Sequence, residues 1–264
     1  MHDQLRVLVD AVHKHDANAQ WLFVGDYINR GPDSRGVIDL LLKLPNARFC
    51  RGNHDDMFDA ILNGEGFVEV LIRNSRLDPF RWFMEHGLGE TLASYGVSDE
   101  QIQSLMAHPT VRALDALIAP VPMAHRRFIR ELPAVLEEPD LFIVHARWEP
   151  DTPDEDPSPT TFLEVDQPLR KTAVWGRYSM EEIDAPKAWR RTGYFGHTPV
   201  DGYGARGGFD RRGGGNLVPI VGNKMVLVDT AAALSVVGRL TAFCPDSQKF
   251  LQVDRNAKLV EPAI

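Results

Sequence analysis

The sequence is short of three features that would place it in other classes of protein. Only two cysteines occur in 264 residues, so the chain is not a disulfide-stapled secreted module. No apolar run approaches the roughly 20 residues that a membrane-spanning helix needs. Basic residues number 29 against 37 acidic ones, and the formal net charge of −8 argues against general binding to nucleic acids or anionic membranes.

What the sequence does contain fits a protein of the cytoplasm with one α/β domain over residues 1–264. Hydrophobic residues make up 44% of the chain, enough for a sizeable core. Cys50 and Cys244 lie in strand-like runs, and we expect both to be core residues without a disulfide. Residues Asp3–His15 read as an amphipathic helix and not as a signal peptide.

Polar residues follow two short apolar runs near the start of the chain. Trp21–Val24 leads into Gly25-Asp26, and Ala47–Cys50 leads into Gly52–Asp55. A helix is expected between them, from about Ser34 to Leu44. In open α/β sheets, ligands gather at the carboxyl ends of the strands. A carboxylate, an amide oxygen and an imidazole that meet there suit a divalent metal of borderline hardness.

The later part of the chain repeats this pattern after a long helical stretch. From residue 57 to about 136 the pattern is helical, with capping residues at Ser98 and Thr110. Two further strand-like runs, Leu141–Val144 and Gly193–Phe195, lead into His145 and Gly196-His197. More strands are expected over Met225–Val228, Leu240–Cys244 and Phe250–Val253. Loops are expected over Glu149–Thr161 and Gly202–Asn216.

Five short motifs together resemble those of the calcineurin-like metallophosphoesterase superfamily. They are Gly-Asp, Arg-Gly-Pro, Gly-Asn-His, Val-His-Ala and Gly-His-Thr-Pro. Within this superfamily, the chain is most similar to the bacterial and phage Ser/Thr phosphoprotein phosphatases. The resemblance implies an α/β fold, a β-sandwich flanked by helices, with a helical insertion at about 57–136. It also implies a metal-dependent phosphoester hydrolase, most closely a serine/threonine protein phosphatase.

The resemblance assigns metal ligands to four residues at strand ends. It implies that Asn53, His145 and His197 hold one ion, and that Asp26 bridges to a second. Mn²⁺ is the expected ion, and Fe, Zn and Ni are the alternatives. In the implied mechanism, metal-bound hydroxide attacks phosphorus directly, without a phosphoenzyme.

Other residues match the catalytic and substrate-binding positions of the family. His54 corresponds to the general acid that protonates the leaving group. Asn29 stands where an aspartate usually orients that histidine. We expect Asn29 to accept a hydrogen bond from the ring without adding charge, so that His54 is a weaker base. Arg30 and Arg177 match residues that bind the substrate phosphate, as does the metal ligand Asn53.

The chain also departs from the family's pattern. A strand ending in Gly-Asp-x-His-Gly usually precedes the first helix, and Met1 falls just after its position. The first strand and two ligands are therefore missing from this chain, which leaves Asp26 for the second ion. We favour a misplaced start over a native truncation, and expect two ions in a full-length form and one here. Arg147 replaces a usual glycine and would either hold or block substrate. Ala231 replaces a second glycine that is usual in the family, which suggests an altered turn.

Three functions remain open at this point. The first is hydrolysis of phosphoserine or phosphothreonine in a phosphoprotein. The second is hydrolysis of a small phosphoester such as a dinucleoside polyphosphate, because some hydrolases of that kind also lack the aspartate at position 29. The third is a catalytically impaired module that binds a phosphorylated partner through Arg30 and the metal. The sequence carries no feature that sets an oligomeric state.

Overall fold

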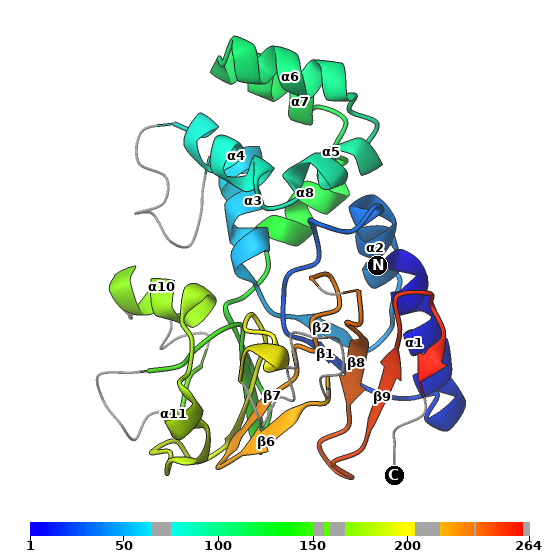
Figure 1. Ribbon diagram of the computed structural model, residues 1–264, viewed down its shortest axis with the longest axis vertical. Coiled ribbons are helices and arrows are strands. Elements are labelled where there is room, and N and C mark those ends of the chain that lie inside the picture. Colours follow the sequence, from blue (N-terminus) through cyan, green and yellow to red (C-terminus); the bar gives the residue numbers. More distant parts are fainter. Residues whose placement is uncertain (65–74, 150–155, 159–166, 204–216, 235, 261–264) are drawn as a thin grey trace.

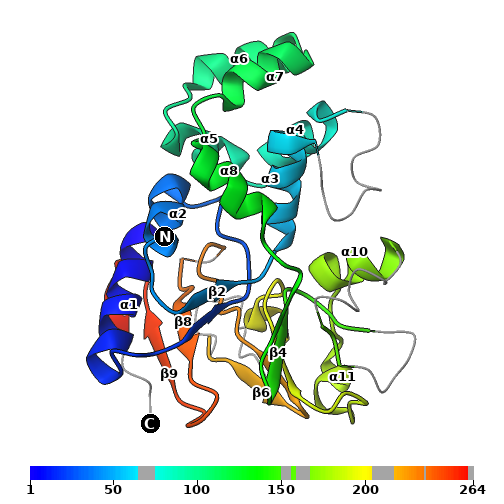
Figure 2. The same cartoon turned by 180° about the vertical axis from the view of Figure 1, so that it is seen from behind.

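The computed structural model describes residues 1–64, 75–149, 156–158, 167–203, 217–234 and 236–260. The helices α3 to α8 gather at one end of the molecule, and the strands lie at the other end with α1, α10 and α11 beside them (Figures 1 and 2). A five-stranded mixed sheet has the order β3-β4-β5-β7-β6, in which β4, β5 and β7 run parallel. Its strands are β3 (Val135–Glu137), β4 (Leu141–Val144), β5 (Thr192–Phe195), β6 (Ile220–Gly222) and β7 (Met225–Leu227).

Two smaller sheets lie against this one. The strands β1 (Trp21–Phe23) and β2 (Ala47–Phe49) pair in parallel, and β8 (Leu240–Phe243), β9 (Phe250–Val253) and β10 (Leu259–Val260) pair antiparallel. A small apolar cluster joins residues within or next to β1 and β2 to residues of β3, β4 and β5. The rings of Tyr194 on β5 and Phe243 on β8 lie 6.0 Å apart. These contacts give the layered arrangement expected of a β-sandwich.

A groove separates β1 from β8 on the side covered by the first helix, α1 (His2–His15). Within the described residues, the strand β1 pairs only with β2, and the strand β8 pairs only with β9. The groove has a volume of about 1420 Å³ and is lined by apolar side chains of α1 such as Leu5 and Leu8. It lies beside β1, whose residues Leu22 and Phe23 contribute to its lining.

The expected helical insertion is the helical block, which we define as α4 to α8. The block follows α3 (Asn53–Asn63), whose first turn belongs to the site. Ser98 caps α6 in a capping box with Gln101, and Thr110 caps α7, as the sequence predicts. The helices of the block are α4 (Leu77–Met84), α5 (Leu88–Ser94), α6 (Asp99–Ala107), α7 (Val111–Ile118) and α8 (Met123–Arg130).

The remaining helices flank the sheets. The helix α2 (Ser34–Leu41) begins after Asp33, whose carboxylate accepts a hydrogen bond from the Gly36 amide at 2.7 Å. The helices α10 (Gln167–Trp175) and α11 (Met180–Asp184) lie on the far side from α1 (Figure 1), and a 3₁₀ turn covers Val200–Tyr203. None of the helices in the described part of the chain is long and apolar enough to cross a bilayer.

Two expectations about these elements are wrong, and two lie mostly outside the described residues. The helical pattern ends at Arg130, because residues 135–137 form β3 by antiparallel pairing with β4. Cys50 is fully buried, but Cys244 is exposed just after β8, and both are free thiols. Most of Glu149–Thr161 and Gly202–Asn216 is not described. The single-domain organisation over 1–264 stays a prediction.

Candidate metal centre

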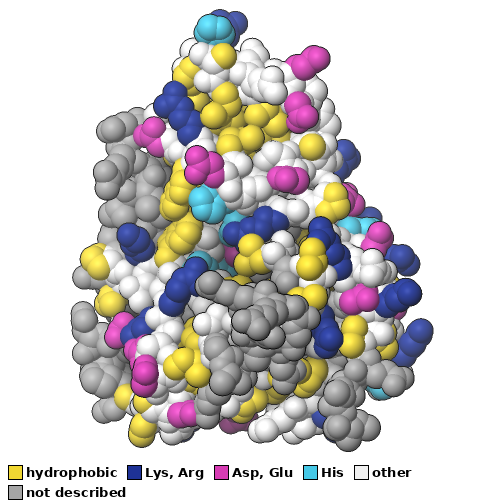
Figure 3. Space-filling view, viewed as in Figure 1, with side chains coloured by type: hydrophobic (Ala, Val, Ile, Leu, Met, Phe, Trp, Pro, Cys, Tyr) yellow, Lys and Arg dark blue, Asp and Glu magenta, His cyan; other side chains and the backbone are white. Residues whose placement is uncertain are grey.

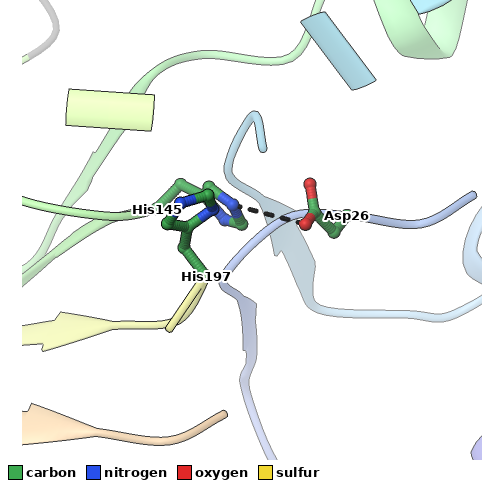
Figure 4. A group of neighbouring side chains, drawn as sticks. All are labelled: Asp26, His145 and His197. Atoms are coloured by element: carbon green, nitrogen blue, oxygen red, sulfur yellow. Dashed lines mark ion pairs between the residues drawn. The ribbon is translucent and has the colours of Figure 1, made fainter. Parts of the chain in front are cut away.

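The four residues expected to bind metal come together at the carboxyl ends of four strands. Asp26 follows β1, Asn53 is the first residue of α3 after β2, His145 follows β4 directly, and His197 follows β5 after one glycine. The imidazoles of His145 and His197 lie side by side and face the carboxylate of Asp26 (Figure 4). We call this group of strand ends the metal rim.

The distances at the metal rim suit a single ion. The Asn53 side-chain oxygen lies 3.0 Å from His145 Nε2 and 2.9 Å from His197 Nδ1. Asp26 Oδ2 lies 3.4 Å from His145 Nε2, and the donor atoms of Asp26, His145 and His197 are all within 4.8 Å of one another. A set of two imidazole nitrogens and two oxygens fits a divalent transition metal with bonds of about 2.0–2.2 Å.

The backbone carbonyl of Val24 orients the first histidine. His145 Nδ1 lies 2.6 Å from this oxygen and donates to it, which directs Nε2 into the site. Burial opposes a charge on His145, but the carboxylate of Asp26 outweighs burial and raises the pKa of His145 to about 9. Conversely, burial favours the neutral acid at Asp26, but the charges of His145 and His54 lower its pKa. A metal ion and a proton therefore compete for the same nitrogen.

His197 has the opposite character. Burial and the neighbouring charge of His145 lower the pKa of His197 to about 3, so its ring is neutral and offers a lone pair. Its backbone has a φ of 64°, and that of Asp26 has a φ of 63°. Non-glycine residues pay about 1–2 kcal/mol for this left-handed conformation. Such strain is concentrated at functional sites, where the surroundings enforce it.

Asp55 fixes the two loops that carry Asp26 and Asn53, a role that the sequence reading missed. Its carboxylate accepts three backbone hydrogen bonds, from Asp26 at 2.8 Å, Tyr27 at 3.0 Å and Gly52 at 2.9 Å. Burial and the charge of Asp26 raise the pKa of Asp55 to about 7, while these three donors favour the ionised form. This role could have been predicted from the position of Asp55, which is the third residue of α3. An acidic side chain at that position can accept a hydrogen bond from the backbone N–H of the residue before the helix.

The contact between Asn29 and His54 corrects the sequence-based expectation. The Asn29 amide nitrogen lies 2.7 Å from His54 Nδ1, so asparagine donates to the ring instead of accepting from it. Thr91 on α5 sets this orientation, because its hydroxyl donates to the Asn29 side-chain oxygen at 2.8 Å. Burial chiefly, and the charge of Arg30, lower the pKa of His54 to about 4. The resting ring is neutral and keeps its proton on Nε2.

The two arginines expected to bind phosphate flank the metal rim. Arg30 has an exposed side chain, and its backbone N–H donates to the carbonyl of Gly87 at 3.2 Å. Arg177 is also exposed, and its guanidinium donates to Thr198, beside His197, at 3.1 Å. Figure 3 shows basic and histidine side chains gathered in the middle of this face, below the helical end. Their roles in binding phosphate stay predictions.

Arg147 is paired away from the metal rim. Its guanidinium binds both carboxylate oxygens of Glu182, at 2.6 and 3.0 Å, and donates to the backbone carbonyl of Arg177 at 2.7 Å. It also donates to Glu149. Neither expected role, to hold substrate or to block it, is visible in these contacts. Arg147 instead fixes the segment that carries Arg177.

Two further residues, Arg51 and Ala231, are held in place by local contacts. Arg51 is buried and structural, because its guanidinium contacts Asp56 and Asp59 at 3.1 and 3.0 Å. Ala231 has a φ of 61°, so it adopts the left-handed turn that a glycine would take with less strain. The turn therefore has the geometry suited to glycine, and the N–H of Ala231 donates to the Asp229 carboxylate at 2.9 Å.

The comparisons with known proteins agree with this geometry. The family model of the calcineurin-like phosphoesterases matches residues 1–200, which contain all four residues of the metal rim. A search of curated proteins finds none that matches the chain. Enzymes of this kind use divalent metals to hydrolyse phosphoesters, and the donor set at the rim fits such an ion. The chain is thus a metal-dependent phosphoester hydrolase, and it belongs to the calcineurin-like phosphoesterase family.

Proposed function

We propose that this protein is a phosphatase that hydrolyses phosphoserine or phosphothreonine esters. One observation carries the proposal: two exposed guanidinium groups lie near the metal rim, where the charge of Arg30 lowers the pKa of His54 and that of Arg177 lowers the pKa of His197. A phosphoryl group at the rim would have these two cations nearby, with the N–H of His54 as a hydrogen-bond donor. The Arg30 and Arg177 forks match pairs of phosphate oxygens.

The chain's own residues divide the work of this reaction. A bound divalent ion supplies Lewis acidity and an activated water. Asp26, Asn53, His145 and His197 would hold the ion, for which we propose Mn²⁺, with Fe, Zn and Ni as alternatives. Arg30 and Arg177 neutralise charge on the phosphoryl oxygens. His54 keeps its N–H on Nε2 because the Asn29 amide occupies Nδ1, and this N–H can donate a hydrogen bond to the leaving oxygen, which then takes its proton from solvent.

A small phosphoester such as a dinucleoside polyphosphate is the second candidate substrate. The observation that favours it is the uncharged Asn29 beside His54, where an aspartate is usual in the protein phosphatases. Without that carboxylate, nothing at Nδ1 favours a charged imidazolium, so His54 stays neutral and is a weaker acid. A substrate with a better leaving group, such as the nucleotide released from a dinucleoside polyphosphate, would need less help from His54. The two free cysteines support a location in the reducing cytoplasm.

The test is a direct assay of the protein reconstituted with Mn²⁺. We expect it to release phosphate from a phosphoserine peptide faster than it cleaves a dinucleoside tetraphosphate. His54→Gln should lower kcat about 10²–10⁴-fold while the metal content stays the same. Faster cleavage of the dinucleotide would establish the second candidate. Retained binding of the phosphopeptide without turnover would instead show a phosphate-binding module.

A further inference from the structure

Aromatic side chains line one side of the catalytic residues. The Phe83 ring lies 5.1 Å from His54, and the Trp175 ring lies 5.9 Å from His197. Phe83 and Trp175 are themselves 6.4 Å apart, so they close the space between the proton donor and a metal ligand. We define the aromatic wall as Trp82, Phe83, His86 and Trp175. Its members come from α4, from the turn after it and from α10.

The aromatic wall continues outward to the protein surface. The Trp82 ring stacks on that of Trp175, with centroids 5.2 Å apart and planes inclined by 16°. His86 lies edge-on to Trp82 at 5.5 Å, and its ring is 6.5 Å from that of His54. Trp82 is 37% exposed although it is among the largest apolar side chains of the molecule. The wall is buried at its inner end and accessible at its outer end.

The phosphate-binding arginines are attached to the two ends of the same wall. The Arg30 backbone binds the carbonyl of Gly87, the residue after His86, at 3.2 Å. Arg177 follows Trp175 by two residues and contacts Thr198 beside the metal rim. A phosphoryl group between the guanidiniums would therefore have aromatic rings next to its leaving group, on the side of His54. On the helical end above this region, Figure 3 shows hydrophobic side chains at the surface.

We propose that the outer aromatic wall, Trp82 with His86, is a subsite for an aromatic side chain of the substrate. This inference rests on the proposed phosphatase function and names its substrate class. The preferred substrate is a phosphopeptide that carries a planar ring on a residue next to the phosphorylated serine or threonine. The ring packs on the exposed part of Trp82 while the ester oxygen faces His54. Aromatic pairs are favourable beyond simple burial, so the ring adds selectivity.

The alternative is that Trp82 only attaches α4 to α10. Stacking on Trp175 would then be a packing contact, and its removal would lower stability without changing which peptide is preferred. The substitution Trp82→Ala separates the two readings, because it removes the exposed ring but leaves Phe83, His54 and both arginines in place. Met123→Ala is the matched control, since Met123 is a 73% exposed apolar residue on α8.

The experiment compares two phosphoserine peptides that differ only by tryptophan or alanine next to the phosphoserine. With the Mn²⁺-loaded protein, we expect kcat/KM to be about three- to tenfold higher for the tryptophan peptide. Trp82→Ala should remove this difference mainly through KM, and Met123→Ala should keep it. Trp82→Leu, which retains bulk, guards against misfolding and should also lose the preference.

Each other result bears on one proposal. Equal kcat/KM for the two peptides in the unmodified protein would overturn the subsite, and so would a preference that persists in Trp82→Ala. An effect of Trp82→Ala confined to a dinucleoside tetraphosphate would overturn the peptide class. If neither peptide is cleaved, the proposed phosphatase function fails. Calorimetric affinities of the same two peptides then decide the subsite, and equal affinities contradict it.

Discussion

In the helical block, most buried positions hold apolar side chains such as Phe83, Leu92 and Leu114, each at 0% exposure. At the metal rim, the buried positions hold carboxylates, amides and imidazoles, among them Asp55 and His145. The backbone differs in the same way. No non-glycine residue described in the block has a positive φ, whereas Asp26 and His197 at the rim do.

This difference indicates that the helical block adds to the free energy of unfolding, whereas the metal rim lowers it. Apolar burial in the block is stabilising by itself, while buried charges are tolerated only when they are paired and hydrogen-bonded. The left-handed residues at the rim add strain, which the packed elements around them must enforce. We therefore expect damage to the block to be measured as lost stability, and damage to the rim as lost metal binding.

The largest expected effect is in the helical block. Leu114→Ala removes a fully buried side chain of α7 and leaves a cavity, so the free energy of unfolding should fall by about 2–5 kcal/mol. Mn²⁺ affinity of the folded protein should not change. Urea denaturation and calorimetric titration measure the two quantities. Val111→Ala, at a 44% exposed position of the same helix, is the control and should cost less than about 1 kcal/mol. A block variant that loses metal affinity would break the comparison.

The next effect is at the rim. Asp55→Asn replaces one carboxylate oxygen by an NH2 group, which cannot accept a hydrogen bond, so the N–H groups of Asp26, Tyr27 and Gly52 are no longer all bound. Because residues behind metal ligands tune affinity, we expect Mn²⁺ binding to weaken about 10–100-fold. Calorimetric titration measures this change. Asp99→Asn, an exposed acid in the first turn of α6, should leave it unaffected. Unaltered metal affinity in Asp55→Asn would mean that the loops carrying Asp26 and Asn53 keep their positions without the three hydrogen bonds to Asp55.

A smaller effect is expected at the segment that carries Arg177. Arg147→Ala removes a hydrogen bond to the Arg177 carbonyl and the pair with Glu182. Loss of one such contact is about 1 kcal/mol, so KM for a phosphopeptide should rise roughly fivefold while kcat changes little. Steady-state kinetics measure both. A lower KM in this variant would show that Arg147 obstructs the substrate.

The smallest effect is a stabilisation. Ala231→Gly relieves a left-handed conformation that costs about 1–2 kcal/mol, and glycine loses about 0.5–1 kcal/mol of this gain through a more flexible unfolded chain. The net gain should be about 0.5 kcal/mol in urea denaturation. Ala232→Gly, at a neighbouring position without positive φ, should destabilise instead. If both variants are destabilised, strain at Ala231 is not a significant cost.

The sequence predicted the strands and the helix starts well because local signals specify them. Leu141–Val144 and Phe250–Val253 match their strands at both ends, and Ser98 and Thr110 cap helices as expected. It failed at Val135–Glu137, which is a strand only because β4 pairs with it. Cys244 was expected to be buried, but it lies after the last paired residue of β8 and faces solvent.

The site was predicted in its composition but not in its fine geometry. Motif order indicated Asp26, Asn53, His145 and His197, and the structure brings them together. The direction of the Asn29 hydrogen bond depends on Thr91, which is 62 residues away in the sequence. The pairing of Arg147 with Glu182 depends on a contact over 35 residues. Local patterns carry no information about such partners.

The most direct test of the metal rim is the metal content of His197→Ala. We expect the unmodified protein, dialysed against Mn²⁺ and then buffer, to retain bound metal in elemental analysis. His197→Ala should retain little metal and hydrolyse no phosphoester, while His108→Ala, an exposed histidine at the end of α6, should behave as the unmodified protein. Equal metal content in His197→Ala and the unmodified protein would contradict the account.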